Sequence, residues 1–118
     1  MQYEKTSDQS PGLDHLKLIK ISPCRKFHTL YKEPLYKSRF FYVEKYHEPG
    51  LAPVCDETGA YHINFKGEAI YSQKFIKTHG FYFNRAAVED DIGCYHINPY
   101  GNRVYKETYH WVGNYLLL

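Results

Sequence analysis

The sequence predicts an all-β protein in which tandem β-hairpin repeats form a short open antiparallel array. The four residues Tyr-His-Ile-Asn at 61–64 recur at 95–98, a spacing of 34 residues. Self-similarity at a fixed period indicates a repeat protein, in which each unit buries its apolar face against the next. The sequence also holds 13 Tyr and 7 Phe, residues that favour the half-buried surface of a pleated sheet. Together the two observations predict a β-repeat.

A period of about 34 residues is also typical of helical tetratricopeptide repeats, so the apolar pattern has to decide between strands and helices. A helix pair needs apolar residues at positions i, i+3, i+4 and i+7 over about a dozen residues. Here the apolar residues alternate or form short groups, which are separated by Gly, Asn and Pro. This pattern is typical of strands and hairpins, so we expect β-structure.

The repeat extends well beyond the four-residue motif. With the 34-residue offset, five further positions match, namely Gly59 with Gly93, Gly67 with Gly101, Tyr71 with Tyr105, Phe75 with Tyr109 and Phe81 with Tyr115. Upstream, the register needs a shift of one residue, after which Tyr36, Phe40 and Tyr46 match Tyr71, Phe75 and Phe81. We therefore expect three copies, at roughly 30–60, 61–94 and 95–118, the last of them truncated. Residues 1–29 are expected to form an N-terminal leader that is partly disordered or irregular.

Within the complete copy, the repeated motif predicts a strand. Tyr61 and Ile63 would lie on one face of this strand, and His62 and Asn64 on the other. The residues that follow, as far as Gly67, predict a turn, because an Asn side chain can bond to the backbone and Gly accepts a positive φ.

Downstream of this turn, residues 68–71 are expected to return as the partner strand. The segments 81–83 and 85–88 predict a further strand or pair of strands, and 89–93 predicts a charged turn into the next copy. The large apolar residues of this copy are expected to form the core; they are Tyr61, Ile63, Tyr71, Phe75 and Phe81.

The repeated pattern reads Gly-x-Tyr-His-Ile-Asn-x-x-Gly-x-x-(Ile or Val)-Tyr, with an aromatic residue four positions later. It resembles the WG repeat family, also called KWG or Leptospira repeats, whose usual core is Gly-Tyr/Phe-Ile-Asp-x-x-Gly followed by an aliphatic and an aromatic residue. The resemblance covers 59–83 and 93–115 well, 35–54 loosely and 1–29 not at all. It is similar to a bacterial subtype that has His before Ile and a Trp-x-Gly-Asn-aromatic element, here at 111–115.

The chain departs from the common family pattern in two ways. It carries Asn64 and Asn98 where Asp is frequent, and it has no Trp in its first two copies. The resemblance implies a β-rich, generally non-catalytic repeat module that binds proteins or sits beside an enzymatic domain, and it brings no established catalytic or ligand residues. We therefore expect a protein-interaction module. The alternative is an accessory domain or truncated fragment of a larger bacterial enzyme whose catalytic domain is absent here.

The polar face of the repeated strand is the candidate contact surface. It carries His62, Asn64, His96 and Asn98, and Trp111 adds an aromatic side chain suited to a protein partner. A structural alternative exists for the two histidines, because a His ring repeated in register can hydrogen-bond a neighbouring turn.

Catalytic and metal-binding functions find little support in the sequence. There is no Gly-x-Ser-x-Gly motif and no phosphate-binding glycine loop, and the carboxylates at 89–91 fall in an expected turn. We therefore expect no enzyme activity and no cofactor. Cys94 and His96 share a strand face, but the residue that matches Cys94 is Ala60, and no Cys-x-x-Cys accompanies them. We expect no metal site for this reason.

Nucleic-acid binding is the other alternative that the charge distribution raises. Residues 1–45 hold nine Lys and Arg against five Asp and Glu, and the remainder holds six against eight. Binders usually show a basic excess over the whole domain, so this segment is more simply a solvated surface.

The cysteine count and the hydropathy bear on the compartment. Three cysteines are an odd number without disulfide-framework spacing, which favours a reducing environment. No apolar run approaches the length of a transmembrane helix, and the N-terminus lacks the basic-then-apolar layout of a secretory signal. We expect a cytoplasmic protein without membrane association, which binds an unknown protein partner or associates with itself.

Stability is the first property to test. Because repeat arrays need about three or more copies with capping ends, we expect the chain to be weakly stable alone, to oligomerise or to pack on another surface. Thermal unfolding of the dilute protein, followed by circular dichroism, is then broad or dependent on protein concentration. A sharp melt of the dilute monomer would contradict this expectation.

Overall fold

The computed structural model describes residues 12–108 and shows an all-β repeat array in this range. The predicted fold class is therefore confirmed. A short 3-10 helix, η1 (Leu13–Leu18), comes first. The strands that follow are β1 (Lys20–Ile21), β2 (His28–Leu30), β3 (Glu33–Pro34), β4 (Tyr42–Val43), β5 (Ala52–Asp56), β6 (Gly59–Ile63), β7 (Lys77–Tyr82), β8 (Arg85–Asp90) and β9 (Gly93–Ile97).

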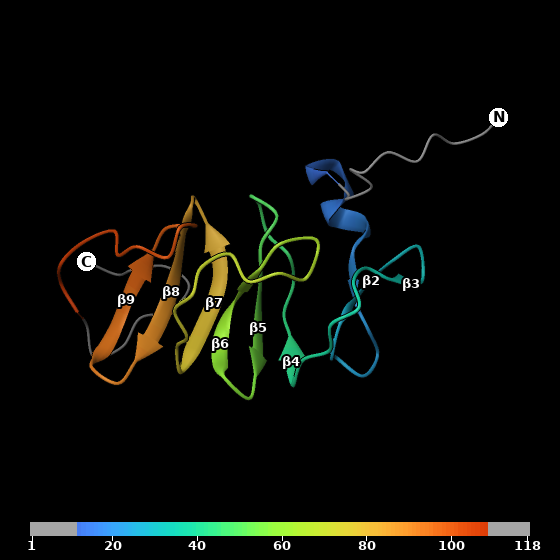
Figure 1. Ribbon diagram of the computed structural model, residues 1–118. Coiled ribbons are helices and arrows are strands. Elements are labelled where there is room, and N and C mark those ends of the chain that lie inside the picture. Colours follow the sequence, from blue (N-terminus) through green and yellow to red (C-terminus); the bar gives the residue numbers. More distant parts are fainter. Residues whose placement is uncertain (1–11, 109–118) are drawn as a thin grey trace.

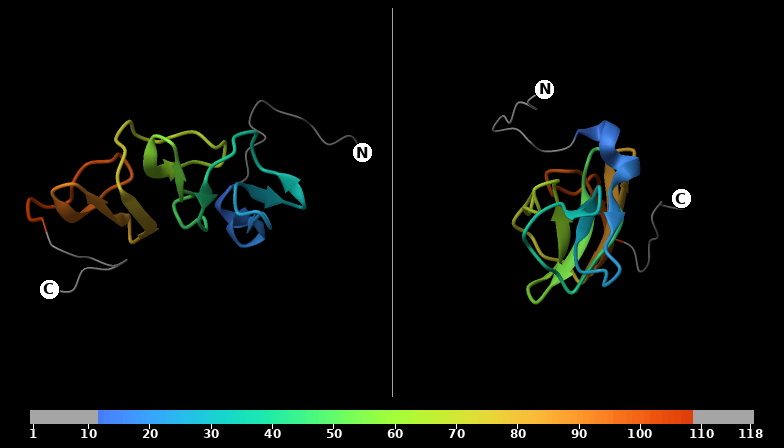
Figure 2. Two further views of the ribbon diagram at one scale, coloured as in Figure 1. Left: turned by 90° about the horizontal axis from the view of Figure 1, so that it is seen from below. Right: turned by 90° about the vertical axis from the view of Figure 1, so that its right-hand side faces the viewer.

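These strands form three small sheets that follow one another along the described chain (Figure 1). Each sheet has three strands, in the orders β1-β2-β3, β4-β5-β6 and β7-β8-β9, and all the pairings are antiparallel. Figure 2 shows the sheets in a row when the molecule is turned. Consecutive strands within a sheet are neighbours, so each sheet is a local unit of the chain.

The hairpins β5–β6 and β8–β9 have the same register, offset by the predicted period. Ala52 pairs with Ile63 in the first hairpin, and Ala86 pairs with Ile97 in the second. An aspartate closes each hairpin in the same way. The Asp90 carboxylate accepts the backbone N–H of Ile92 at 2.9 Å and the hydroxyl of Tyr95 at 2.8 Å. The matching aspartate of the first hairpin, 34 residues earlier, makes the equivalent bonds to Thr58 and Tyr61.

The turn after the repeated strand is also confirmed. The side-chain oxygen of Asn64 accepts the backbone N–H of Lys66 at 2.9 Å and that of Glu68 at 3.0 Å. Gly67 has a φ of +79°, as expected for the end of this turn. A Cβ at this position would also lie 2.8 Å from the ring of Tyr36, so only glycine lets the turn approach that ring.

The one-residue shift between the first and second copies lies in this turn. In the first copy the turn has only two central residues, Tyr31 and Lys32, both with positive φ, and Leu30 pairs directly with Glu33. Positive φ at both central residues is the geometry of a tight hairpin turn. The second copy uses the longer Asn-initiated turn, and this accounts for the extra residue.

The predicted return strand at 68–71 is wrong. Only isolated bridges, Ile63 to Ala69 and Ala60 to Phe75, pair β6 with the described chain that follows it, and its hairpin partner is the preceding strand β5. Tyr71 in this segment turns inward, and it is 8% exposed. The charged turn predicted at 89–93 is shorter than expected, since Glu89 and Asp90 belong to β8.

Paired strands already occur upstream of the predicted boundary between leader and repeat. The paired residues of β1 and β2, at 20–21 and 28–29, lie in the segment 1–29 that was predicted as the leader. Phe27 occupies the position of Tyr61, and each ring is covered by a cation, Arg39 at 3.9 Å from the Phe27 centroid and Lys74 at 4.5 Å from the Tyr61 centroid. The disorder predicted for the start of the chain lies outside the described residues.

The core runs through all three sheets as one cluster, and it contains every residue predicted for it. Aromatic rings join one unit to the next at the same spacing each time. Tyr71 and Phe75 have ring centroids 5.9 Å apart, and Phe75 then lies 6.3 Å from Tyr95 of the next unit. The buried members that carry aromatic rings are Tyr36, Phe40, Tyr46, Tyr61, Tyr71, Phe75, Phe81 and Tyr95.

Replacement of Gly67 by alanine tests the turn. We expect G67A to lower the free energy of unfolding by roughly 1–3 kcal/mol, because the new Cβ is strained at positive φ and meets the Tyr36 ring. Urea denaturation measures the change. Gly12→Ala is the control, since an added Cβ there meets only the exposed carboxylate of Asp14. Equal free energies of unfolding for the two variants would contradict the role given to Gly67 in the turn.

Candidate functional site

The repeated histidines are buried, so their place in the predicted contact surface is wrong. His62 and His96 are both 0% exposed, although they lie on the strand face opposite Tyr61, as predicted. Alternation assigns side chains to two faces, but in β6 both faces are covered. The structural alternative for the histidines is confirmed at His62, whose ring bonds to neighbouring segments.

His62 links three parts of the chain. Its Nδ1 lies 2.5 Å from the hydroxyl of Tyr71, and its Nε2 lies 2.8 Å from the backbone carbonyl of His79 in β7. A carbonyl only accepts, so Nε2 carries the proton and donates it, and Nδ1 accepts from the tyrosine hydroxyl. The ring of Phe81, also in β7, packs on the imidazole with centroids 4.6 Å apart. A residue of β6 is thereby bound to the first strand of the next sheet.

The same arrangement occurs one unit earlier, at a position that the sequence analysis missed. His28 lies 34 residues before His62 and is also fully buried. Its Nδ1 lies 2.5 Å from the Tyr36 hydroxyl, and its Nε2 lies 2.7 Å from the carbonyl of Glu44. The ring of Tyr46 packs on it at 4.4 Å. We call this set, a His with its Tyr hydroxyl, carbonyl and stacked ring, the histidine latch.

Burial keeps the latch histidines neutral. It lowers the pKa of His28 and that of His62 to about 4, and the bonds to the backbone carbonyls only partly offset this effect. Burial also raises the pKa of the Tyr71 hydroxyl, which therefore stays protonated and donates. The latch is a structural device that joins sheets, and it holds no group poised for proton transfer at neutral pH.

The third latch is incomplete within residues 12–108. His96 Nδ1 lies 2.6 Å from the Tyr105 hydroxyl, but the buried Nε2 of the same ring has no hydrogen-bond partner. Burial and the positive charge of Arg85 hold the pKa of His96 below its usual range.

The remaining predicted site residues have different positions. The side-chain oxygen of Asn64 is fully used in its turn, and that of Asn98 accepts the backbone N–H groups of Tyr100 and Asn102 in the matching turn. Asn98 also lines a surface hollow, described below. Trp111 lies outside the described residues. The structure therefore does not bring the five predicted residues together as one surface.

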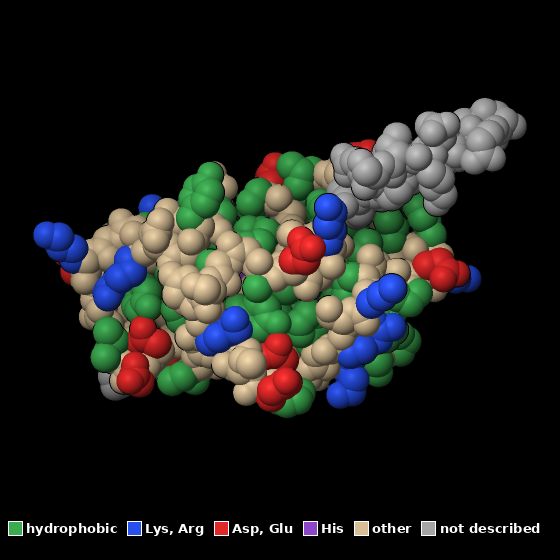
Figure 3. All heavy atoms as spheres, viewed as in Figure 1, with side chains coloured by type: hydrophobic (Ala, Val, Ile, Leu, Met, Phe, Trp, Pro, Cys, Tyr) green, Lys and Arg blue, Asp and Glu red, His purple; other side chains and the backbone are tan. Residues whose placement is uncertain are grey.

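The exposed apolar surface lies elsewhere, at the tips of the loops. Phe83 is 98% exposed at the turn between β7 and β8, and Tyr100 is 80% exposed in the turn after β9. Tyr82 and Leu13 are also exposed, and Pro49 lies between them. Figure 3 shows hydrophobic side chains projecting from the rim above β7 and β8. We name Leu13, Pro49, Tyr82, Phe83 and Tyr100 the apolar edge.

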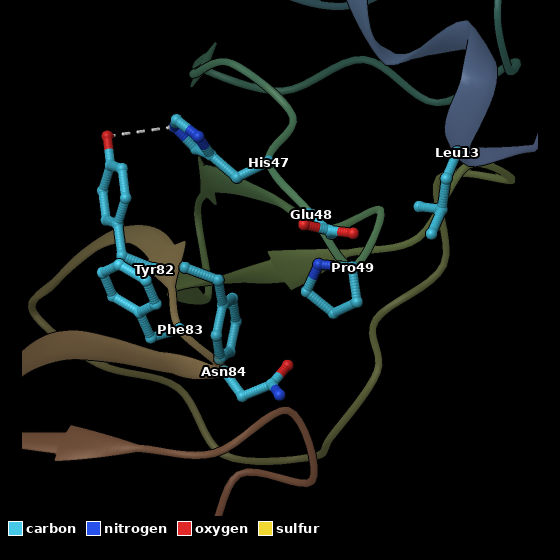
Figure 4. A pocket seen from close by; sticks show the side chains of 8 residues that line it. Leu13, His47, Glu48, Pro49, Tyr82, Phe83 and Asn84 are labelled. Atoms are coloured by element: carbon cyan, nitrogen blue, oxygen red, sulfur yellow. Dashed lines mark hydrogen bonds between the residues drawn. The ribbon is translucent and has the colours of Figure 1, made fainter.

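Two adjoining hollows lie along the apolar edge. The first, about 570 Å³, lies between η1, the turn before β5 and the β7–β8 tip (Figure 4). The second, about 600 Å³, continues toward the turn after β9 and includes Leu51 and Ile70. Pro49 and Asn84 line both hollows, so the two adjoin at these residues, and we refer to the pair of hollows as the groove.

His47 holds one wall of the groove in place. Its Nε2 lies 3.4 Å from the Tyr82 hydroxyl, and the two rings pack with centroids 4.7 Å apart (Figure 4). Gly80 leaves room for this ring, since a Cβ there would lie 2.5 Å from Cδ2 of His47. Burial and nearby Lys45 lower the pKa of His47, so the ring is held neutral beside the tyrosine.

Sequence reasoning missed the apolar edge because it placed Phe83 in a strand. Phe83 and Asn84 both have positive φ, which makes them the central pair of a tight turn between β7 and β8. The signal was the Asn, which favours such turns, between two apolar groups. An aromatic residue at the other central position cannot reach the core from there.

Comparison of the chain with protein-family models, curated proteins and solved structures finds no match. Within residues 12–108, no three His, Cys, Asp or Glu side chains gather in a way that would hold a metal ion. In the same range, no helix has the length and apolar character needed to cross a membrane.

The latch predicts a loss of stability in acid. The folded pKa of His28 and His62 lies below the unfolded value of about 6.5, so the unfolded chain binds protons first as the pH falls. Above about pH 6.5 we expect these two histidines to cause no change in the free energy of unfolding with pH. Below it we expect the free energy of unfolding to fall by up to about 1.4 kcal/mol per pH unit for each His, until about pH 4. Urea denaturation at pH 7, 6 and 5 measures this slope.

Two variants separate the titration from the loss of a bond. His62→Asn is expected to reduce the acid slope, because one of the rings whose pKa the fold lowers is gone. Tyr71→Phe removes the hydroxyl and costs stability of roughly 1–3 kcal/mol, but it keeps the His62 ring and therefore the slope. An unchanged slope in His62→Asn would show that this ring is not held neutral by the fold.

Proposed function

We propose that this chain is a non-catalytic β-repeat module that binds a protein partner through its apolar edge. The observation that carries the proposal is the placement of Phe83, which is 98% exposed at a hairpin tip beside the groove. Exposed apolar groups that gather on one surface mark interaction sites, and aromatic side chains dominate interface energetics. The resemblance of the repeat to WG repeats supports the same proposal.

The groove defines the chemistry of the partner. Its two hollows are lined mainly by Pro, Leu, Ile and aromatic side chains, which favours apolar side chains from the partner. Glu48 is an exposed carboxylate at the rim of the first hollow. A partner segment that carries an apolar residue near a Lys or Arg fits this arrangement, because the rim carboxylate favours a positive charge there.

The partner is best sought with the full chain as bait. A candidate recovered from the host is then purified, and its dissociation constant is measured by calorimetry against the wild-type chain and two variants. Phe83→Asp is expected to weaken binding at least about tenfold, because it removes the exposed ring. Asp tolerates positive φ, so this change does not strain the turn.

Ile92→Asp is the matched control. Ile92 is 69% exposed in the turn at the other end of β8, so it offers a similar apolar side chain away from the apolar edge. The proposed surface would be contradicted if both variants weakened partner binding equally, or if neither variant weakened it. If the partner that binds through Phe83 is an enzyme, the chain acts as an accessory domain for that enzyme.

A further inference from the structure

The two complete latches use the same two groups from the following sheet. One is a backbone carbonyl, of Glu44 or His79, which accepts the Nε2–H of the histidine at 2.7 and 2.8 Å. The other is an aromatic ring two residues later, Tyr46 or Phe81, which packs on the imidazole. Both groups come from one extended segment, so a single strand completes a latch.

His96 lacks both groups within the described residues. Its ring is 0% exposed, and its Nε2 is buried without a hydrogen-bond partner. A buried donor that makes no bond is costly, so native proteins rarely leave one unpaired. The other nitrogen is already satisfied by Tyr105, which fixes the ring with Nε2 directed at the missing group. The third unit therefore presents a half-built binding site for a strand.

The spacing of the chain identifies the missing strand. The carbonyl of the latch comes eight residues after the latch tyrosine in both complete units, from Tyr36 to Glu44 and from Tyr71 to His79. Eight residues after Tyr105 is Gly113. The stacked ring comes ten residues after the tyrosine in both units, and the tenth residue after Tyr105 is again an aromatic one, Tyr115.

A buried position directly before the carbonyl residue agrees with this register. Val43 and Thr78 directly precede the two carbonyl residues, and they are 0% and 4% exposed. The third equivalent is Val112, a residue of the same shape as both. We propose that residues 111–115 of this chain bind to the third sheet as a strand. In this arrangement Gly113 gives its carbonyl to His96 Nε2, and Tyr115 packs its ring on the imidazole.

The proposal is independent of the apolar edge and of any partner. In the two complete units, the carbonyl that completes the latch comes from the first strand of the following sheet or from the residue next to it. Glu44 directly follows β4, and His79 lies in β7. In the proposed arrangement, the strand at 111–115 is therefore equivalent in position to β4 and β7. The occupant of the site is a segment of the same molecule, because the connecting chain has the same length as in the two complete units.

Hydrogen exchange and NMR of the imidazole groups in the full chain test the proposal. We expect the Nε2 protons of His28, His62 and His96 all to exchange slowly, and that of His96 to show a nuclear Overhauser contact with the Tyr115 ring. Tyr115→Ala is expected to speed exchange at His96 at least about tenfold. Leu118→Ala, at a position outside the latch register, is the control and should leave the rate unchanged.

The signals of His28 and His62 report whether each variant is folded, so a loss confined to His96 is specific. A second variant that ends after Thr108 should show the same loss at His96 with the other two latches intact. Slow exchange at His96 in this shorter variant would overturn the proposal. So would protection that disappears on dilution of the full chain, because a second copy would then supply the strand.

Discussion

The fold depends on a buried imidazole that joins each sheet to the next. In a continuous sheet, backbone hydrogen bonds join each strand to its neighbour. Here the three sheets are separate ladders, and only isolated backbone bonds cross between the described sheets, such as that from Val43 to the carbonyl of Arg25 at 3.0 Å. The His62 ring spans the junction, since it accepts from Tyr71 of its own unit and donates to the carbonyl of His79 in the next sheet. Because an unmade bond in this buried position is costly, the latch fixes the distance and the register between sheets as well as adding stability.

The latch also explains why burial of a polar side chain is tolerated in the first two units. Both nitrogens of the neutral ring find a partner, so the complete latches leave no buried polar atom unpaired. Their apolar surroundings are aromatic rings, which pack around the imidazole at centroid distances of 4.4 to 5.8 Å. Neutrality follows from the same burial that lowers the histidine pKa. The latches therefore stabilise the array most at and above neutral pH, where the imidazoles carry no charge.

The sequence predicted those parts of the fold that depend on local chemistry. The turn begun by Asn64 and ended by Gly67 could be read from its residues, because each has a specific backbone role. The burial of His62 could not, since alternation separates two faces but does not say that a neighbouring unit covers the second. His28 was missed because the shorter turn after it shifts the register of the first copy. The apolar edge was missed because Phe83 was assigned to a strand, when its turn directs the side chain away from the core.

The structural core and the proposed binding surface occupy different parts of this molecule. The latches and the aromatic core are buried, and the apolar edge is exposed on η1, at the end of β7 and on the neighbouring turns. A substitution at Phe83 leaves all latch contacts in place, because this residue touches neither the imidazoles nor their partners. The exception is the link through β7, since Phe81 packs on His62 and also lines the groove. If a partner binds the groove as proposed, Phe81 is the described residue through which that contact would reach a latch.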